Sequence, residues 1–323
     1  MVFNTNIMND NKQQSTKNQD DSTNKIKEFR LKKIQNDKIA FLYEKLGDKK
    51  KASYLRNCSN QPVFYIDPVT HKPKVLTNFF CRQRLCPMCS WQRAKKTFSD
   101  VFAIISEPEF KNLEYIFITL TIKNCKGEDL QNNLDTLLSG WRGLTGTKRK
   151  PFRLRFTGMF RGLEITYNKK TNTYHPHLHV LCAVGKDYFS KTNKNYLSQE
   201  KLIRLWKSAC NLDYEPSVDI RKVKNEEYKA VSEIAKYTVK SSDIANEKVL
   251  KVLDKALYNR RLISYHDLFK TVKAKLKIED SEDKFISDSN FNAILANPEI
   301  IKTMYKWNFG TKTYNLVRVI ESE

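Results

Sequence analysis

The sequence lacks several features that define large classes of proteins. Its longest apolar runs, such as residues 115–120, are far shorter than the roughly 20 residues that cross a membrane. The amino terminus has no charged-then-apolar signal pattern, so a cytoplasmic protein without a membrane partner is expected. Its one Gly-Lys pair, Gly185-Lys186, lacks the upstream glycine and the following Ser or Thr of a phosphate-binding P-loop. Neither a membrane-spanning protein nor a P-loop motor is therefore expected.

Acidic residues are few relative to basic ones. The 323-residue chain has 36 Asp and Glu against 58 Lys and Arg, which gives a formal net charge of +22. Such a charge favours a polyanionic partner, above all nucleic acid, and predicts binding that weakens steeply with salt. Solvated basic surfaces, ribosome-associated proteins and membrane-surface proteins share this composition, so charge alone does not choose among them.

Histidine is scarce too, with five in the chain, yet three of them fall between residues 175 and 179. The surrounding segment, 161–181, has two apolar runs around a polar turn, which predicts an antiparallel hairpin. If the turn is symmetric, Glu164 faces His177 across the two strands. Because residues two apart share a sheet face, His179 joins them.

Two imidazoles and a carboxylate on one sheet face form an open three-ligand site for a divalent cation. The predicted ligands are Glu164, His177 and His179, and His175 lies at the outer end of the same face. The alternative is a surface strand with solvated histidines. The apolar residues that alternate with the histidines argue against it, because they give the strand an opposite face to bury.

Seven cysteines in a chain without a signal pattern favour thiols or metal ligands over disulfides. Cys86 and Cys89 form a Cys-x-x-Cys knuckle, which Cys58 and Cys81 can complete as a tetrahedral site for structural Zn²⁺. Reduced cysteines without a metal and a redox Cys-x-x-Cys motif are the alternatives, and His71 is a candidate substitute ligand.

The remaining patterns divide the chain into four segments. Residues 1–24 are polar and are predicted to be a disordered tail, and residues 25–110 to hold basic helices and the cysteine-rich module. Residues 111–245 mix strands and helices, which predicts an α+β domain with an antiparallel sheet and helices over one face. Residues 246–323 are predicted to be mostly helical, with a short strand pair around Gly310. The expected strands before that are 115–122, the hairpin and 217–223, and the expected helices are 91–106, 129–144, 198–211, 226–242 and 246–272.

The helix expected over residues 226–242 places Glu233 and Tyr237 on one face, and Lys240 continues that face. A tyrosine near a metal and lysines can act as a nucleophile, because positive charge stabilises phenolate. A carboxylate one turn away can act as a general base on a water. From spacing alone, a buried tyrosine with a satisfied hydroxyl and a solvated glutamate are the alternative.

Basic residues near these motifs are candidate DNA contacts. Residues 148–155 pack five basic side chains around one aromatic residue, which is typical of a phosphate-contacting loop or of a solvated basic loop. The DNA-binding candidates are Lys148, Arg149, Lys150, Arg153, Arg155, Lys236 and Lys240.

Three motifs occur in the order Phe117-Ile-Thr-Leu-Thr121, His175-Pro-His-Leu-His-Val-Leu181 and Glu233-Ile-Ala-Lys-Tyr-Thr-Val-Lys-Ser-Ser-Asp243. This ordered set resembles the motifs of plasmid rolling-circle replication initiators in the HUH endonuclease superfamily. The segment Arg84-Leu-Cys-Pro-Met-Cys-Ser-Trp91 resembles the cysteine cluster that some members carry upstream. The motifs span residues 117–243, and the flanks resemble the family more loosely.

The resemblance implies a five-stranded antiparallel sheet with the metal site on its central strands. His177 and His179 match the paired histidines, Glu164 falls where a third ligand for Mg²⁺ or Mn²⁺ is expected, and Tyr237 matches the nucleophile. Many relatives have two tyrosines, whereas this chain has Glu233 one turn before Tyr237. That resembles the single-tyrosine branch, in which the glutamate activates water for the closing cleavage.

The function that the resemblance implies is nicking of plasmid origin DNA, single-stranded or in an extruded hairpin. A phosphotyrosine intermediate would start and terminate rolling-circle replication. Lacking a P-loop, the chain would recruit a host helicase as well as a polymerase, and it could act as an oligomer on DNA. Two alternatives stay open: a non-catalytic, zinc-containing origin-binding protein or repressor, and a related HUH transposase or relaxase.

Overall fold

The computed structural model describes residues 6–146, 150–190, 192–224, 227–236, 238–279, 297 and 300–320. The chain divides into two compact units, Met1–Cys89 with Asp283–Glu323, and Ser90–Glu282. These borders differ from the expected ones at residues 110 and 245. The physical reason is that residues before 110, such as Val101, and residues after 245, such as Phe269, pack into the core of the second unit.

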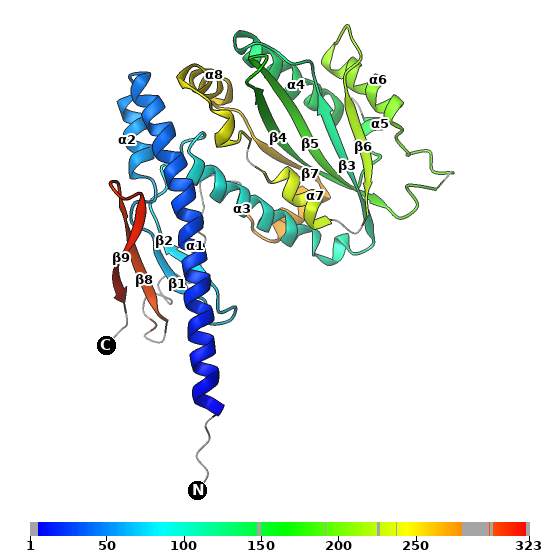
Figure 1. Ribbon diagram of the computed structural model, residues 1–323. Coiled ribbons are helices and arrows are strands. Elements are labelled where there is room, and N and C mark those ends of the chain that lie inside the picture. The colour runs from blue at the N-terminus through cyan, green and yellow to red at the C-terminus, as the bar shows by residue number, and fades with distance from the viewer. Residues whose placement is uncertain are drawn as a thin grey trace. The chain divides into compact units, whose positions relative to one another are not determined.

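The second unit contains a five-stranded antiparallel sheet in the order β6-β3-β5-β4-β7 (Figure 1). A five-stranded antiparallel sheet was predicted, and the expected strand 115–122, the hairpin and strand 217–223 are all confirmed. The fifth strand lies in the segment expected to be helical, where the alternating Ile-Ser-Tyr-His-Asp sequence pairs with β4 instead. The strands are β3 (Leu113–Thr121), β4 (Gly158–Asn168), β5 (Thr173–Gly185), β6 (Val218–Val223) and β7 (Ile263–Asp267).

The register of the central hairpin agrees with a symmetric turn. Glu164 pairs with His177 and Gly162 pairs with His179. On its other side β5 pairs with β3, where Thr119 faces His179. Because directly paired residues share a face, Glu164, His177, His179 and Thr119 all project from the same side of the sheet.

Helices cover both faces of the sheet, not one as expected. On the histidine face, aromatic and aliphatic side chains of the sheet pack against α3 (Pro87–Ile105), α7 (Glu227–Ile234) and α9 (Leu268–Lys275). The central residues of this core are Phe117, Phe160, Leu181, Val101, Ile104, Val231, Ile234 and Phe269. The helix expected over residues 91–106 is therefore present as α3, and its residues Val101 and Ile104 belong to the core on this face.

The opposite face carries α4 (Leu130–Thr145) and α6 (Gln199–Cys210) (Figure 1). Trp206 of α6 donates its indole N–H to the Thr121 carbonyl over 2.7 Å, and Trp141 of α4 donates to Nε2 of His266 over 3.2 Å. Both helices match expected ones. The unit also holds α5 (Lys150–Arg153) and α8 (Glu247–Leu257).

Helix α7 ends at Ile234, eight residues before the expected end. Beyond it the chain lies against β4, because the backbone N–H of Ile165 donates to the Thr238 carbonyl over 2.7 Å. Lys240 is extended, with φ −72° and ψ 135°. This bond to the sheet, together with β-branched Thr238 and Val239, replaces further helix. The prediction that Glu233 and Lys240 share a helical face is therefore wrong.

In its described residues, the first unit combines two helices with a sheet of order β2-β1-β8-β9. The helices are α1 (Asn6–Lys45) and α2 (Lys49–Asn57), and the strands are β1 (Val63–Ile66), β2 (Pro73–Thr77), β8 (Lys302–Asn308) and β9 (Thr313–Ile320). The strand pair around Gly310 is confirmed, but with β7 it makes the C-terminal segment less helical than predicted.

The tail predicted to be disordered is helical from Asn6 onward. No glycine or proline occurs between Asn6 and Lys45, so nothing in the local sequence stops a helix once it has formed. Among the residues that the structure describes, no helix is long and apolar enough to cross a membrane.

Two glycines of α4 offer a matched test of the α4–α6 packing. A Cβ atom on Gly140 would overlap with Sγ of Cys210, whereas one on Gly143 would lie 3.8 Å from its nearest neighbour, the Ala209 carbonyl oxygen. Gly143→Ala should stabilise the protein by about 0.5–1 kcal/mol, because alanine loses less backbone entropy in a helix. Gly140→Ala should destabilise it by about 1–3 kcal/mol through overpacking. Urea denaturation measures both, and a stabilising Gly140→Ala would contradict the packing.

Candidate functional site

The three predicted metal ligands converge at one point on the hairpin. Oε2 of Glu164, on β4, lies 3.0 Å from Nε2 of His177 and 3.0 Å from Nε2 of His179, both on β5. The three ligand atoms lie within 4.8 Å of one another. Their residues are only 8%, 8% and 9% exposed, so the group is nearly closed off from bulk water by its protein neighbours.

The outer nitrogens of both imidazoles have partners that orient the rings. His177 Nδ1 lies 3.2 Å from the His175 carbonyl oxygen, and His179 Nδ1 lies 3.3 Å from Oγ1 of Thr119. A partner on Nδ1 directs the lone pair of Nε2 toward the ligand site. His175 contributes its carbonyl here, and its ring is not one of the three converging groups. Thr119 was not predicted, although it lies within the motif at 117–121.

The charge of Glu164 is stabilised locally. Burial alone would raise the pKa of its carboxyl, but hydrogen bonds and positive charge from His177 and His179 outweigh that and lower the pKa. Lys240 adds a cation, with Nζ 3.9 Å from Oε1 of Glu164. One carboxylate oxygen and two imidazole nitrogens form a donor set that suits Mn²⁺. It suits Mg²⁺ less well, because Mg²⁺ prefers oxygen ligands, but it leaves coordination positions for such ligands with either ion.

The end of α7 is pressed against the hairpin beside this group. Gly162 of β4 faces His179, and a Cβ atom there would lie 2.7 Å from the Ile234 carbonyl oxygen. Only glycine allows that approach. The chain thus contacts β4 at Gly162 through Ile234 and at Ile165 through Thr238, on either side of Glu164. Sequence reasoning missed Gly162, whose signal is a glycine inside an otherwise bulky strand.

Of the two predicted catalytic residues, the structure describes Glu233 but not Tyr237. The Glu233 carboxylate forms an ion pair with Lys236, one turn away, and both side chains are more than a third exposed. Tyr237 lies outside the described residues. The described residues on either side of it are the ones that contact β4 at Gly162 and Ile165.

In the basic loop at residues 148–155, the arginine side chains that the structure describes bond to other parts of the protein. Lys148 and Arg149, and the side chain of Lys150, lie outside the described residues. Arg153 pairs with Asp267, its Nε lying 2.8 Å and 3.0 Å from the two carboxylate oxygens. Arg155 Nη1 donates to the Asn195 carbonyl over 2.8 Å. These partners are far away in sequence, so the local charge pattern could not reveal them.

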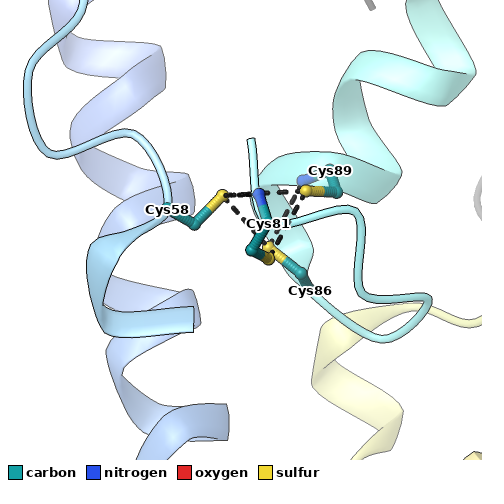
Figure 2. Close-up of side chains that lie close together, drawn as sticks. All are labelled: Cys58, Cys81, Cys86 and Cys89. Carbon is teal, nitrogen blue, oxygen red and sulfur yellow. Dashed lines mark hydrogen bonds between the residues drawn. The ribbon is translucent and has the colours of Figure 1, made fainter. Parts of the chain in front are cut away.

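The four predicted cysteines also come together (Figure 2). Sγ of Cys58 lies 3.6 Å from those of Cys86 and Cys89, and Sγ of Cys81 lies 3.7 Å from that of Cys89. All four residues are buried. His71, the candidate substitute, is exposed, lies just after the turn at residues 68–70 and is not in this group.

Comparison with known proteins places the chain in a family. The family model for replication proteins matches residues 72–315. A Rep protein from Bacillus amyloliquefaciens is 36% identical over 329 residues, covering 91% of this chain and 95% of its own. Another from a Bacillus species is 39% identical over 260 residues, covering 72% of this chain and 83% of its own. One from Streptococcus pneumoniae is 32% identical, covering 82% of this chain and 86% of its own.

The antiparallel sheet with a buried Glu-His-His group thus occurs in a replication protein. The chain belongs to the family of plasmid Rep proteins. No solved structure matches it.

The converging ligands predict a single divalent-cation site in this unit. Mn²⁺ titration by isothermal calorimetry should show one site, which His179→Ala weakens by at least about 10-fold because a ligand is lost. His175→Ala is the matched control, since its ring is not among the converging groups, and should bind Mn²⁺ within a few-fold of the unmodified chain. Equal Mn²⁺ affinity in the two variants would refute the ligand set.

Proposed function

We propose that the protein nicks one strand of plasmid origin DNA and so initiates and terminates rolling-circle replication. The observation that carries the proposal is the buried Glu164-His177-His179 group, with the chain on both sides of Tyr237 attached to the same strand, β4. Membership of the Rep family supports it, as does the net charge of +22.

Glu164, His177 and His179 would hold the cation, Mg²⁺ or Mn²⁺. When bound, the cation supplies Lewis-acid polarisation of the scissile phosphate. The rest of the chain orients the reactants. Burial of the three ligands limits competing water, and the outer contacts from Thr119 and the His175 carbonyl hold the imidazoles ready.

Tyr237 is the proposed nucleophile. Its oxygen would attack the phosphorus, forming a phosphotyrosyl bond to the 5′ end and breaking the bond to the 3′ oxygen. The tyrosyl proton leaves to solvent or to a nearby base, and the 3′-hydroxyl becomes the primer. The short connection from Ile234 to Thr238, held at both ends against β4, supports delivery of the residue between them to the cation site.

Glu233 is the proposed base for the terminating cleavage. Its carboxylate would take a proton from a water that attacks the second phosphate, so the enzyme would not form a second tyrosyl link. Glu233 forms an ion pair with Lys236, and DNA phosphates that compete for Lys236 would free the carboxylate to act as the base. Glu233 directly precedes Ile234, whose carbonyl contacts Gly162 beside the proposed cation ligands. This position supports its role as the base.

DNA contacts are assigned to the exposed cations. Lys236 and Lys240 flank position 237, and both are about half exposed. Lys148, Arg149 and Lys150 remain candidates in the loop, whereas Arg153 and Arg155 would have to give up internal partners. Nicking would require locally unpaired DNA, so an extruded origin hairpin is the proposed substrate. A host helicase and polymerase would extend the primer, and assembly into an oligomer on DNA is part of the proposal.

Tyr237→Phe should abolish covalent attachment to DNA. The unmodified chain, mixed with a single-stranded origin oligonucleotide and Mn²⁺, should give an SDS-stable adduct, since the phosphotyrosyl bond survives denaturation. Phenylalanine cannot form that bond. Tyr228→Phe, on the exposed part of α7, is the matched control and should keep the adduct. An undiminished adduct with Tyr237→Phe would rule out this nucleophile, and a chain that binds the origin but never cleaves would favour a non-catalytic origin-binding protein.

Glu233→Ala should separate initiation from termination. The first nick depends on Tyr237 and the cation site, so its rate should fall by less than about 10-fold, whereas hydrolysis at a second origin site should fall by about 10²–10⁴-fold with loss of the base. Single-turnover assays on an oligonucleotide with two nick sites measure both steps. Unchanged termination would remove the role, and transfer of the strand into unrelated DNA would favour a transposase or relaxase.

A further inference from the structure

We infer that Cys58, Cys81, Cys86 and Cys89 bind one structural Zn²⁺ ion, and that buried Lys33 of α1 is the counter-charge of that site. The inference concerns the first unit and does not rest on the proposed nicking activity. It begins from the spacing of the four sulfur atoms, which come from the C-terminal end of α2, the loop that holds Cys81, and the start of α3.

The sulfur spacing agrees with a zinc tetrathiolate. In a tetrahedral site with Zn–S bonds of about 2.3 Å, neighbouring sulfurs lie about 3.8 Å apart. The separations between Sγ atoms are 3.6 Å for Cys58–Cys86, 3.6 Å for Cys58–Cys89 and 3.7 Å for Cys81–Cys89. A disulfide requires sulfurs about 2.05 Å apart, and all four cysteines are free thiols in the structure.

Backbone N–H groups also face the sulfurs. The N–H of Cys89 lies 3.4 Å from Sγ of Cys86, and the N–H of Cys81 lies 3.5 Å from Sγ of Cys58 (Figure 2). A thiolate accepts such bonds more strongly than a thiol does. The first pair lies at the start of α3, within the Cys-x-x-Cys knuckle, so the loop is shaped to turn two sulfurs inward.

Lys33 is the independent observation. Its side chain is 0% exposed, and its Nζ donates to the carbonyls of Arg56 and Cys58 over 2.6 Å and 2.8 Å. It therefore caps the C-terminal end of α2 and the residue that supplies the first sulfur. A buried ammonium is costly unless negative charge lies nearby.

The carboxylate near Lys33 is shared with a second cation. Asp37 Oδ1 lies 4.0 Å from Lys33 Nζ, and Asp37 Oδ2 lies 3.3 Å from Lys312 Nζ. One negative charge thus faces two positive ones. Four thiolates and one Zn²⁺ carry a net charge of 2−, so a zinc site would place further negative charge beside buried Lys33, whereas four neutral thiols would place none there.

Zinc binding also predicts one local rearrangement. Sγ of Cys86 lies 3.0 Å from Oδ1 of Asn36, a contact in which the sulfur donates as a thiol. A zinc-bound sulfur has no proton, so the Asn36 amide must turn a donor toward it. Asn36 is fully buried and its Nδ2 donates to the Leu55 carbonyl, so the change stays inside the first unit.

The test is metal analysis of the purified full-length chain. Native mass spectrometry and elemental analysis should find about one zinc per chain, and Cys86→Ser should lose it. Cys125→Ser, a buried cysteine outside the group, is the matched control and should keep the zinc. Cobalt substitution should give the visible spectrum of a tetrahedral tetrathiolate. Iron in place of zinc, or zinc retained by Cys86→Ser, would overturn the assignment.

A second measurement avoids variants that fail to fold. Treating the unmodified chain with a chelator should release zinc and make Cys58, Cys81, Cys86 and Cys89 alkylatable together, as peptide mass spectrometry would show. A folded, zinc-free chain whose four thiols react before any chelator is added would also overturn the assignment.

The role of Lys33 has its own readout. Lys33→Met should lower zinc affinity about 10- to 100-fold in competition with a chromophoric chelator, the usual effect of losing an outer-shell partner. Lys38→Met, on the exposed side of the same helix, should leave zinc affinity unchanged. Equal affinities in the two variants would remove Lys33 from the site and leave the four sulfurs alone.

Discussion

The pairing of β4 with β5 is the constraint on which the second unit depends. A shift of one residue in this pairing would place Glu164 of β4 and the two histidines of β5 on opposite faces of the sheet. The turn after Asn168 and the two buried faces hold that register. Helices cover both faces of the sheet. The Glu-His-His group lies where the histidine face meets the end of α7, beside the apolar core and not within it.

Gly162 connects this register to the chemistry that we propose. It faces His179 and leaves room for the Ile234 carbonyl, so α7 can end directly beside the proposed cation ligands. The chain then changes from helix to an extended segment bonded to β4 at Ile165. Gly162 of β4 thereby sets how closely the end of α7 approaches the hairpin. The first unit depends on a different feature, the cluster of four cysteine thiols, which α1, α2 and the start of α3 surround.

Local pattern was sufficient for much of the fold. The strands at 115–122 and 217–223, the hairpin and the helices before and after it follow from periodicity and β-branched composition, and the structure contains them. The same approach failed where long-range contacts decide. Residues 263–267 form a strand because β4 has an open edge for them, α7 stops because Ile165 bonds to Thr238, and Arg153 pairs with Asp267 more than a hundred residues away.

What the sequence by itself determined is the chemistry: one carboxylate and two histidines in hairpin register, four cysteines before residue 90, and an excess of positive charge. Those features depend on residue type and on spacing within a strand or knuckle, which local geometry fixes. Only the tertiary structure decided which helix meets the histidine face, that Gly162 admits it, and that Lys33 is buried beside the cysteines. These outcomes depend on contacts between segments far apart in the chain, where burial and charge balance, not spacing, select the partner.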